Sequence, residues 1–197
     1  MKNFLIILLI LLLCVSALVA CSEAEDPYEG VLGDPSEETV EVSQWDRLEN
    51  PPALFLNLTI ENQPLQQIQS LQNGASWQYV SQDGSTVGWN ADSPHPLQLM
   101  LSDFNPVTLH LNESEGYIEL EFSVNSPPVI ITAKRWPAEF ATESQDIDGV
   151  YNLWEMVELS DKTLNLVNNG HSYIYELTVE WPGRGRAAYV FRVISEN

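Results

Sequence analysis

The stretch Tyr173-Ile174-Tyr175-Glu176-Leu177-Thr178-Val179-Glu180-Trp181 alternates large apolar residues with residues that are mostly polar. Successive side chains of a β-strand point to opposite faces, so every second residue from Tyr173 onward shares one face. The intervening Glu176, Thr178 and Glu180 would face water. This period of two predicts a half-buried strand with one face in a core.

The same period recurs along most of the chain and predicts a set of short strands. It is present in Leu54–Ile60, Leu97–Leu101, Val107–Leu111, Ile118–Val124 and Tyr189–Val193, and Val129–Thr132 is a further apolar run. Only Leu65–Leu71 favours a short helix. Many short strands with turn residues between them favour an all-β, antiparallel sandwich over residues 53–197.

One hairpin is predicted in detail. Asp83-Gly84 lies between the strand-like segments Trp77–Val80 and Val87–Trp89, and this dipeptide is typical of a two-residue turn. Such a turn would pair Gln78 with Trp89. Trp77 and Trp89 would then lie on opposite faces of the hairpin.

The N-terminus has the features of an export signal. Lys2 is followed by an apolar run from Phe4 to Val19, which ends in Leu18-Val19-Ala20-Cys21. This segment closely resembles the signal and lipobox of bacterial lipoproteins. The resemblance implies a signal peptide at residues 1–20, a diacylglycerol and palmitate-type anchor on Cys21, and a place on the outer face of the cell membrane. A plain signal peptide or an uncleaved anchor would also put the domain outside the cytoplasm.

Composition limits the partners of the chain. The formal net charge is −20, so a nucleic acid would be repelled by most of the surface. Residues 21–52 follow the signal and are rich in Asp and Glu, which predicts a disordered, lipidated tether. With Cys14 in the signal and Cys21 lipidated, no disulfide is expected, and stability has to come from a hydrophobic core.

Two segments resemble known families. Tyr173–Trp181, a glycine-rich turn and Ala188–Val193 look like the closing hairpin of immunoglobulin-like modules in bacterial surface proteins. Trp77–Tyr79, Asp83-Gly84 and Ala91–Leu97 are similar to segments of small uncharacterised lipoproteins of Gram-positive bacteria. The first resemblance implies an immunoglobulin-like sandwich, although the cysteine pair of antibody domains is missing.

Signals for catalysis are weak. His95 lies between Pro94 and Pro96 and close to Asp92, an arrangement that would raise the pKa of the imidazole if the carboxylate contacts it. A hydrolase based on His95 and Asp92 is one hypothesis, and an ordinary loop histidine is the alternative. His110 and His171 are expected to face solvent. No nucleophile motif accompanies any of them.

Calcium is the only cofactor for which the sequence offers a motif. Ser144–Glu155 follows the twelve-residue calcium-loop pattern, with Asp146, Asp148 and Glu155 at ligand positions. Ser144 replaces the usual first aspartate, which would weaken the site. The alternative is an acidic connecting loop. Zinc spacing motifs are absent.

Aromatic residues near the predicted turns are candidates for a ligand surface. Trp89, Trp136 and Trp181 would display their rings there, unless these rings fill the sandwich core.

The few cations offer a second candidate. Lys134 and Arg135 precede Trp136, and Arg184 and Arg186 follow Trp181-Pro182. They would form one basic spot, or would pair with neighbouring carboxylates.

These patterns together favour a non-catalytic binding module of the cell envelope. Its loops would bind an envelope protein or a ligand of the cell wall. The alternatives are a calcium-dependent adhesion or sensing domain and a cell-envelope hydrolase.

Overall fold

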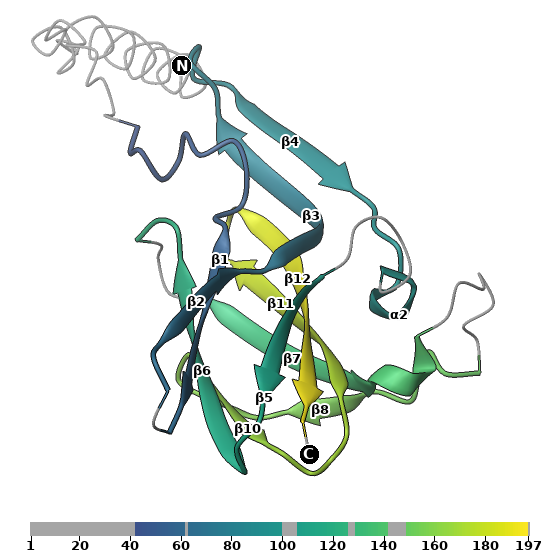
Figure 1. The fold of residues 1–197 in the computed structure, drawn as a ribbon. Helices are drawn as coiled ribbons and strands as arrows, with labels where there is room; N and C mark the ends of the chain where they lie inside the picture. Colours follow the sequence, from purple (N-terminus) through teal and green to yellow (C-terminus); the bar gives the residue numbers. More distant parts are fainter. Residues whose placement is uncertain (1–41, 62, 100–105, 126–128, 142–148, 197) are drawn as a thin grey trace, which may run out of the picture. The chain divides into compact units, whose positions relative to one another are not determined.

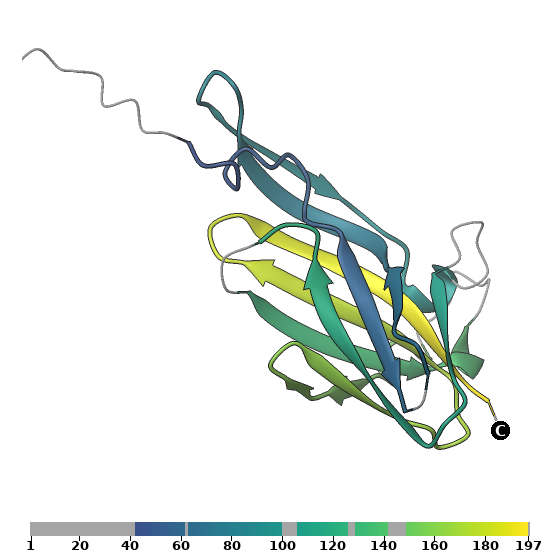
Figure 2. The same ribbon diagram turned by 60° about the vertical axis from the view of Figure 1, so that its left-hand side comes forward.

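Strands make up nearly all of the regular structure, and they form two sheets that pack face to face (Figures 1 and 2). The computed structural model describes residues 42–61, 63–99, 106–125, 129–141 and 149–196. The predicted signal, Cys21 and the tether up to residue 41 lie outside the described residues. Among the described residues, no helix has the length and apolar character needed to cross a membrane.

The first sheet has five strands in the order β2-β1-β6-β10-β9. Its strands are β1 (Leu54–Ile60), β2 (Gln66–Gln69), β6 (Glu115–Phe122), β9 (Leu159–Ser160) and β10 (Thr163–Val167). All of its pairs are antiparallel. We call it sheet A.

The second sheet, sheet B, has seven strands, six of which follow the order β4-β3-β12-β11-β7-β8. They are β3 (Leu71–Val80), β4 (Thr86–Ala91), β7 (Ile130–Pro137), β8 (Glu155–Val157), β11 (Tyr173–Trp181) and β12 (Gly185–Ser195). The seventh, β5 (Val107–Leu111), runs parallel to the second half of β12, whereas the first half of β12 pairs with β3. A bulge between Ala187 and Tyr189 marks this change of partner.

The main core lies between the two sheets and follows the predicted period of two. Sheet A contributes Leu54, Leu56, Leu58, Ile118, Leu120 and Leu164, and sheet B contributes Trp77, Tyr175, Leu177, Val179, Tyr189 and Phe191. The rings of Tyr175 and Phe191 stack with their centroids 5.1 Å apart. The prediction of an all-β sandwich is therefore confirmed, and its strand pairs are antiparallel except for β5 with β12.

A second, smaller core covers one end of the outer face of sheet B. The short helix α2 (Pro96–Leu99) and the 3-10 turn η1 (Ala138–Phe140) lie over this end. The buried residues there are Leu97, Leu99, Trp136, Ile174 and Val190. Sheet B is thus covered on both faces at this end and on one face at the other.

The prediction of a strand over Leu97–Leu101 is wrong, because α2 occupies its first part. Pro96 supplies a φ angle suited to the first turn of a helix. The backbone N–H of Leu97 donates to Nδ1 of His95 over 3.2 Å, which caps that turn. The remainder of the predicted strand lies outside the described residues.

The predicted short helix over Leu65–Leu71 is also wrong. This segment forms β2 and the first residue of β3. β2 pairs with β1, and the amide of Gln67 donates to Oε2 of Glu121 on β6 over 3.0 Å. Cross-strand pairing outweighs the weak local preference for a helix.

The hairpin register differs from the prediction by one residue. Trp77 lies opposite Trp89, and Val80 lies opposite Thr86. The loop is longer than two residues because Ser81 and Ser85 bond across it and Gly84 adopts a φ of 84°. Trp77 and Trp89 consequently share the inner face.

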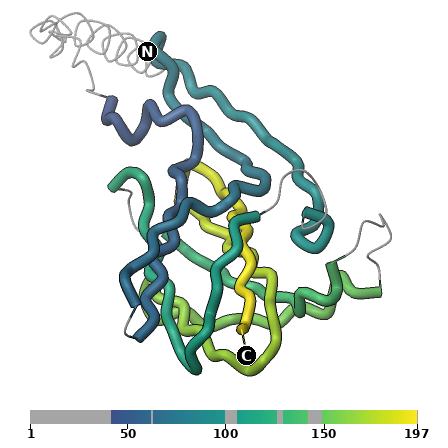
Figure 3. Tube along the Cα trace, viewed as in Figure 1, coloured from purple at the N-terminus to yellow at the C-terminus, as the bar shows by residue number. Residues whose placement is uncertain are grey.

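The folded unit begins earlier than the predicted boundary at residue 53. Compact structure extends from Val42, and the backbone N–H of Val80 donates to the carbonyl of Asp46 over 2.7 Å. The tube in Figure 3 traces the segment before β1 alongside the end of β3. Residues 43–49 are therefore part of the folded unit, and we call them the docked segment.

Candidate functional site

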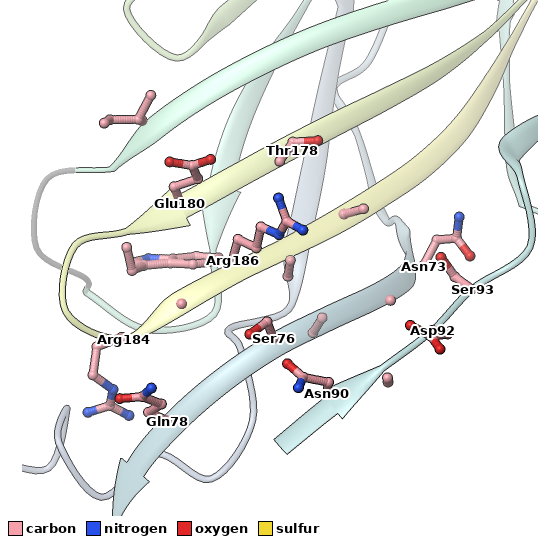
Figure 4. A pocket seen from close by; sticks show the side chains of 18 of the residues that line it. Asn73, Ser76, Gln78, Asn90, Asp92, Ser93, Thr178, Glu180, Arg184 and Arg186 are labelled. Carbon is pink, nitrogen blue, oxygen red and sulfur yellow. The ribbon is translucent and has the colours of Figure 1, made fainter. Parts of the chain in front are cut away.

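A groove lies on the outer face of sheet B, at the end that α2 leaves open. Its volume is about 1370 Å³. Figure 4 shows Thr178, Glu180 and Arg186 on one side of Ser76, and Asn73, Asn90, Asp92 and Ser93 on the other. Strands β4, β3, β12 and β11 therefore all contribute side chains to one polar surface.

Small residues line the floor of the groove and leave its space open. Ser76, Thr178 and Ala188 occupy outward positions of three adjacent strands, where larger side chains would fill the space. The backbones approach closely where β12 begins, since a Cβ on Gly185 would lie 2.0 Å from the carbonyl oxygen of Ser76. Gly185 has a φ of 136°, which L-residues rarely adopt. Glycine is thus required at this edge of the groove.

Two side chains of opposite charge lie next to each other on adjacent strands of the groove. Glu180 and Arg186 are direct partners in the β11–β12 register, and both are exposed. Within the described part of the chain, the side chain of Arg186 makes no hydrogen bond or ion pair. Its five N–H donors are therefore available to a ligand.

Arg184, only two residues away, has a structural role. Its guanidinium donates to the carbonyl of Trp45 over 2.7 Å and to that of Leu48 over 2.9 Å, and lies 3.4 Å from a carboxylate oxygen of Asp46. Burial lowers the pKa of Arg184, and the nearby Asp46 carboxylate opposes that shift. Arg184 fastens the docked segment to the end of the groove.

The ring of Trp181 lies in the core. Trp181 is 2% exposed and meets Trp77 edge to face, with the ring centroids 5.3 Å apart. Trp45 of the docked segment packs against Trp77 at 5.8 Å. The sequence left two interpretations of these aromatic residues open, and for Trp181 the one in which the ring fills the sandwich core applies.

The other two candidate tryptophans are also held by internal contacts. Trp136 is 3% exposed and belongs to the second core. Trp89 is half-buried, and its indole N–H donates to the carbonyl of Glu49 over 2.9 Å. Neither ring offers an open platform to a ligand.

His95 does not form the predicted pair with Asp92. Its ring packs against Trp136 at 5.0 Å and Tyr151 at 5.1 Å, and its Nδ1 accepts the capping hydrogen bond of α2. Burial, together with the charge of Lys134, lowers the pKa of His95, so the expected rise is wrong. Asp92 instead lines the groove.

The other two histidines are exposed, as predicted. Nδ1 of His110 lies 2.5 Å from a carboxylate oxygen of Glu196. His171 lies beyond the turn at Gly170.

The predicted basic spot is divided between two places. Lys134 and Arg135 lie toward the far end of β7, where Arg135 pairs with Glu155 over 2.7 Å and Lys134 lies over the ring of Trp154. Arg184 and Arg186 belong to the start of β12 and its turn. Of the four cations, only Arg186 points into the groove without a protein partner among the described residues.

Two of the three candidate calcium ligands, Asp146 and Asp148, lie outside the described residues. The third, Glu155, begins β8 and bonds Arg135 through Nε over 2.8 Å. In the described part of the chain, no group of three or more His, Cys, Asp or Glu side chains is arranged to hold a metal ion. Calcium binding stays an untested hypothesis.

Comparison with protein-family models, with curated proteins and with solved structures finds no match for this chain. A ligand of this chain therefore has to be inferred from the groove, and its anchor from the sequence.

Most groove residues were not identified from the sequence. Asn73, Ser76, Thr178 and Ala188 are small or polar residues at outward strand positions, where such residues are ordinary. One signal was available: the outward positions of β11 and β12 change from the apolar Ile174 and Val190 at the covered end to Thr178, Ala188 and the charged Glu180 and Arg186 at the open end. Only the pairing of strands in space assembles them into one surface.

Proposed function

We propose that this protein is a non-catalytic binding module of the bacterial cell envelope, anchored by lipid on Cys21, and that the groove on sheet B holds its ligand. The observation that carries this proposal is the groove itself, which has small residues on its floor and polar residues on its walls, and in which the side chain of Arg186 has no partner among the described residues. The ligand would therefore bind to the outer face of sheet B, and not to the loops as the sequence suggested.

The lining chemistry favours a polar ligand without a large negative charge. Amide, hydroxyl and carboxylate groups from Asn73, Asn90, Ser93 and Asp92 suit a ligand with many hydroxyl or peptide groups. Arg186 and Glu180 suit one that carries both a carboxylate and an ammonium or amide group. A polyanion would be repelled by a chain of net charge −20. Wall glycopeptides, which combine sugars with short peptides, have this chemistry.

The anchor and the finer fold belong to the same proposal. The lipobox at Leu18–Cys21 supports lipidation, and the acidic residues up to 41 would hold the domain away from an anionic membrane. The hairpin β11–β12 supports an immunoglobulin-like sandwich.

A binding measurement tests the function. Calorimetry with the detergent-solubilised full chain and a soluble digest of cell-wall glycopeptides should give saturable binding. Ala188→Trp should weaken it by about tenfold or more, about 1.4 kcal/mol, because the indole fills the floor. Glu119→Trp, on the exposed outer face of sheet A, is the matched control and should bind normally. Equal affinities of the two variants, or turnover of the digest, would refute the proposal.

A labelling experiment tests the anchor. Cells that express the chain and are fed an alkyne-bearing palmitate analogue should label it, and Cys21→Ser should remove the label and leave the signal uncleaved. Label retained in the Cys21→Ser variant would contradict lipidation at this residue.

A further inference from the structure

β4 is an unusually open edge strand. It is the outermost strand of sheet B at the groove side and has six residues. The other strands with a single partner, β5, β2, β8 and β9, have five, four, three and two. Edge strands of this length expose backbone N–H and C=O groups that pair readily with another strand.

The usual features that block an open edge are missing from β4. Thr86–Ala91 contains no charged residue and no proline. Its register with β3 runs without a bulge from Ala75 opposite Ala91 to Val80 opposite Thr86. By contrast, β8 begins with the ion-paired Glu155. The sequence of β4 therefore leaves its outer edge free to accept hydrogen bonds.

The register identifies which backbone groups face outward. Ser81 and Ser85 bond across the hairpin through their main chains. Hydrogen-bonded and non-bonded pairs alternate along an antiparallel ladder. The N–H and C=O groups of Thr86, Gly88 and Asn90 consequently point away from β3.

Hydrogen bonds within the chain fix the conformation of β4 and its hairpin loop in the absence of a partner. The indole of Trp89 is fixed by the carbonyl of Glu49. In the hairpin loop, Asp83 accepts the backbone N–H of Ser85 over 3.0 Å, and hydrogen bonds from Ser81 and Ser85 lower the pKa of Asp83 to about 2. A rigid edge loses little conformational entropy when it pairs.

The absence of charge on β4 favours a second copy of the chain as the partner of this edge. With a net charge of −20, most surfaces of two copies repel each other, but β4 itself is neutral. In an antiparallel pairing of β4 with itself about Gly88, Thr86 of one copy lies opposite Asn90 of the other. By the same count, the flanking Asp92 lies opposite Gly84, and Asp83 opposite Ser93. No carboxylate faces another.

We propose that two copies of this chain associate through antiparallel pairing of their β4 strands about a twofold axis at Gly88. The three outward residues of each copy then exchange about six backbone hydrogen bonds. Such an interface is isologous and closes at two copies.

The pairing has a consequence for the groove. Asn90, Asp92 and Ser93 form the outer wall of the groove. Because the proposed twofold axis is perpendicular to sheet B, the outer faces of this sheet in the two copies lie on the same side of the dimer. The two grooves therefore join into one longer surface. The dimer itself does not depend on the proposed function, since it forms whether or not the groove binds a ligand.

Cross-linking in intact membranes tests this interface. Gly88→Cys places two sulfhydryls on the axis, where the Cα atoms of directly opposed residues lie about 5.5 Å apart, a distance that a disulfide spans. Mild oxidation should convert most of this variant to a species of twice the chain's mass. Glu119→Cys and the parent chain, which retains its own cysteines, set the background and should stay monomeric.

Light scattering on the detergent-solubilised full chain supplies an independent measurement. The parent chain should have the mass of a dimer. Gly88→Asp opposes two carboxylates on the axis and should halve the mass at low salt. Asn165→Asp, at an exposed position of β10 in sheet A, is the control and should not. Unchanged tryptophan fluorescence verifies that each variant is folded. A monomeric parent chain, or a Gly88→Cys variant that links only to a different protein, overturns the proposal.

Discussion

The two ends of the outer face of sheet B are built on the same strands and differ in what covers them. At one end, Ile174 and Val190 are fully buried beneath α2 and η1. At the other end, Thr178 and Ala188 line an open groove. The inner faces of both ends are equally buried. The outer face of sheet B is thus left open as a groove where Thr178 and Ala188 replace the larger apolar side chains and where none of the described residues packs over them.

The largest difference between the two ends should appear in stability. Trp136→Ala empties the second core and should lower the free energy of unfolding by about 3–5 kcal/mol. Thr178→Ala, at the open end, should change it by less than about 0.5 kcal/mol. Chemical denaturation with a single transition measures both. Similar losses in the two variants would mean that the groove is as tightly packed as the covered end.

Two arginines at the border of the groove provide a smaller contrast. Arg184→Met leaves the carbonyls of Trp45 and Leu48 without their donor and should cost about 1–3 kcal/mol. Arg186→Met should leave stability almost unchanged and should weaken ligand binding. Thermal melts and calorimetry on the same preparations separate the two effects. A destabilised Arg186→Met variant would show that this side chain has a structural role.

The effect of pH should be the smallest and should come from the covered end. Because the pKa of His95 is lowered by burial and by Lys134, the unfolded chain binds a proton more readily than the folded one. Stability contributed by neutral His95 is therefore present above its ordinary value of 6.5 and is lost as the pH falls through 6.5 toward the lowered value.

His95→Asn removes this titration and keeps an acceptor for the N–H of Leu97. Melting temperatures from pH 5 to 8 should therefore slope less in this variant than in the parent chain. Equal slopes would mean that other groups control the pH dependence.

The sequence predicts the inner core well because that core follows a strict period of two. It predicts the second core poorly. Tyr173-Ile174-Tyr175 and Tyr189-Val190-Phe191 interrupt the alternation with a third apolar residue, and that interruption marks the covered end.

The remaining errors of the sequence-based predictions arise from particular hydrogen bonds and backbone angles. One glycine with positive φ sets the loop length and hence the face of Trp89, and a histidine cap with Pro96 converts a predicted strand into α2. Arg184 makes residues 43–49 part of the fold, although their acidic surroundings predict a tether. Each of these depends on contacts between residues distant in the chain or on one backbone angle, which periodicity does not encode.

Methyl NMR on the full chain, titrated with the cell-wall digest, compares the two ends in a single experiment. The methyl signals of Thr178 and Ala188 should shift on binding, while those of Ile174 and Val190, on the same two strands, should stay fixed. Shifts at Ile174 and Val190 with none at Thr178 and Ala188, or no shift at any of the four, would contradict the assignment of the open end as the ligand site.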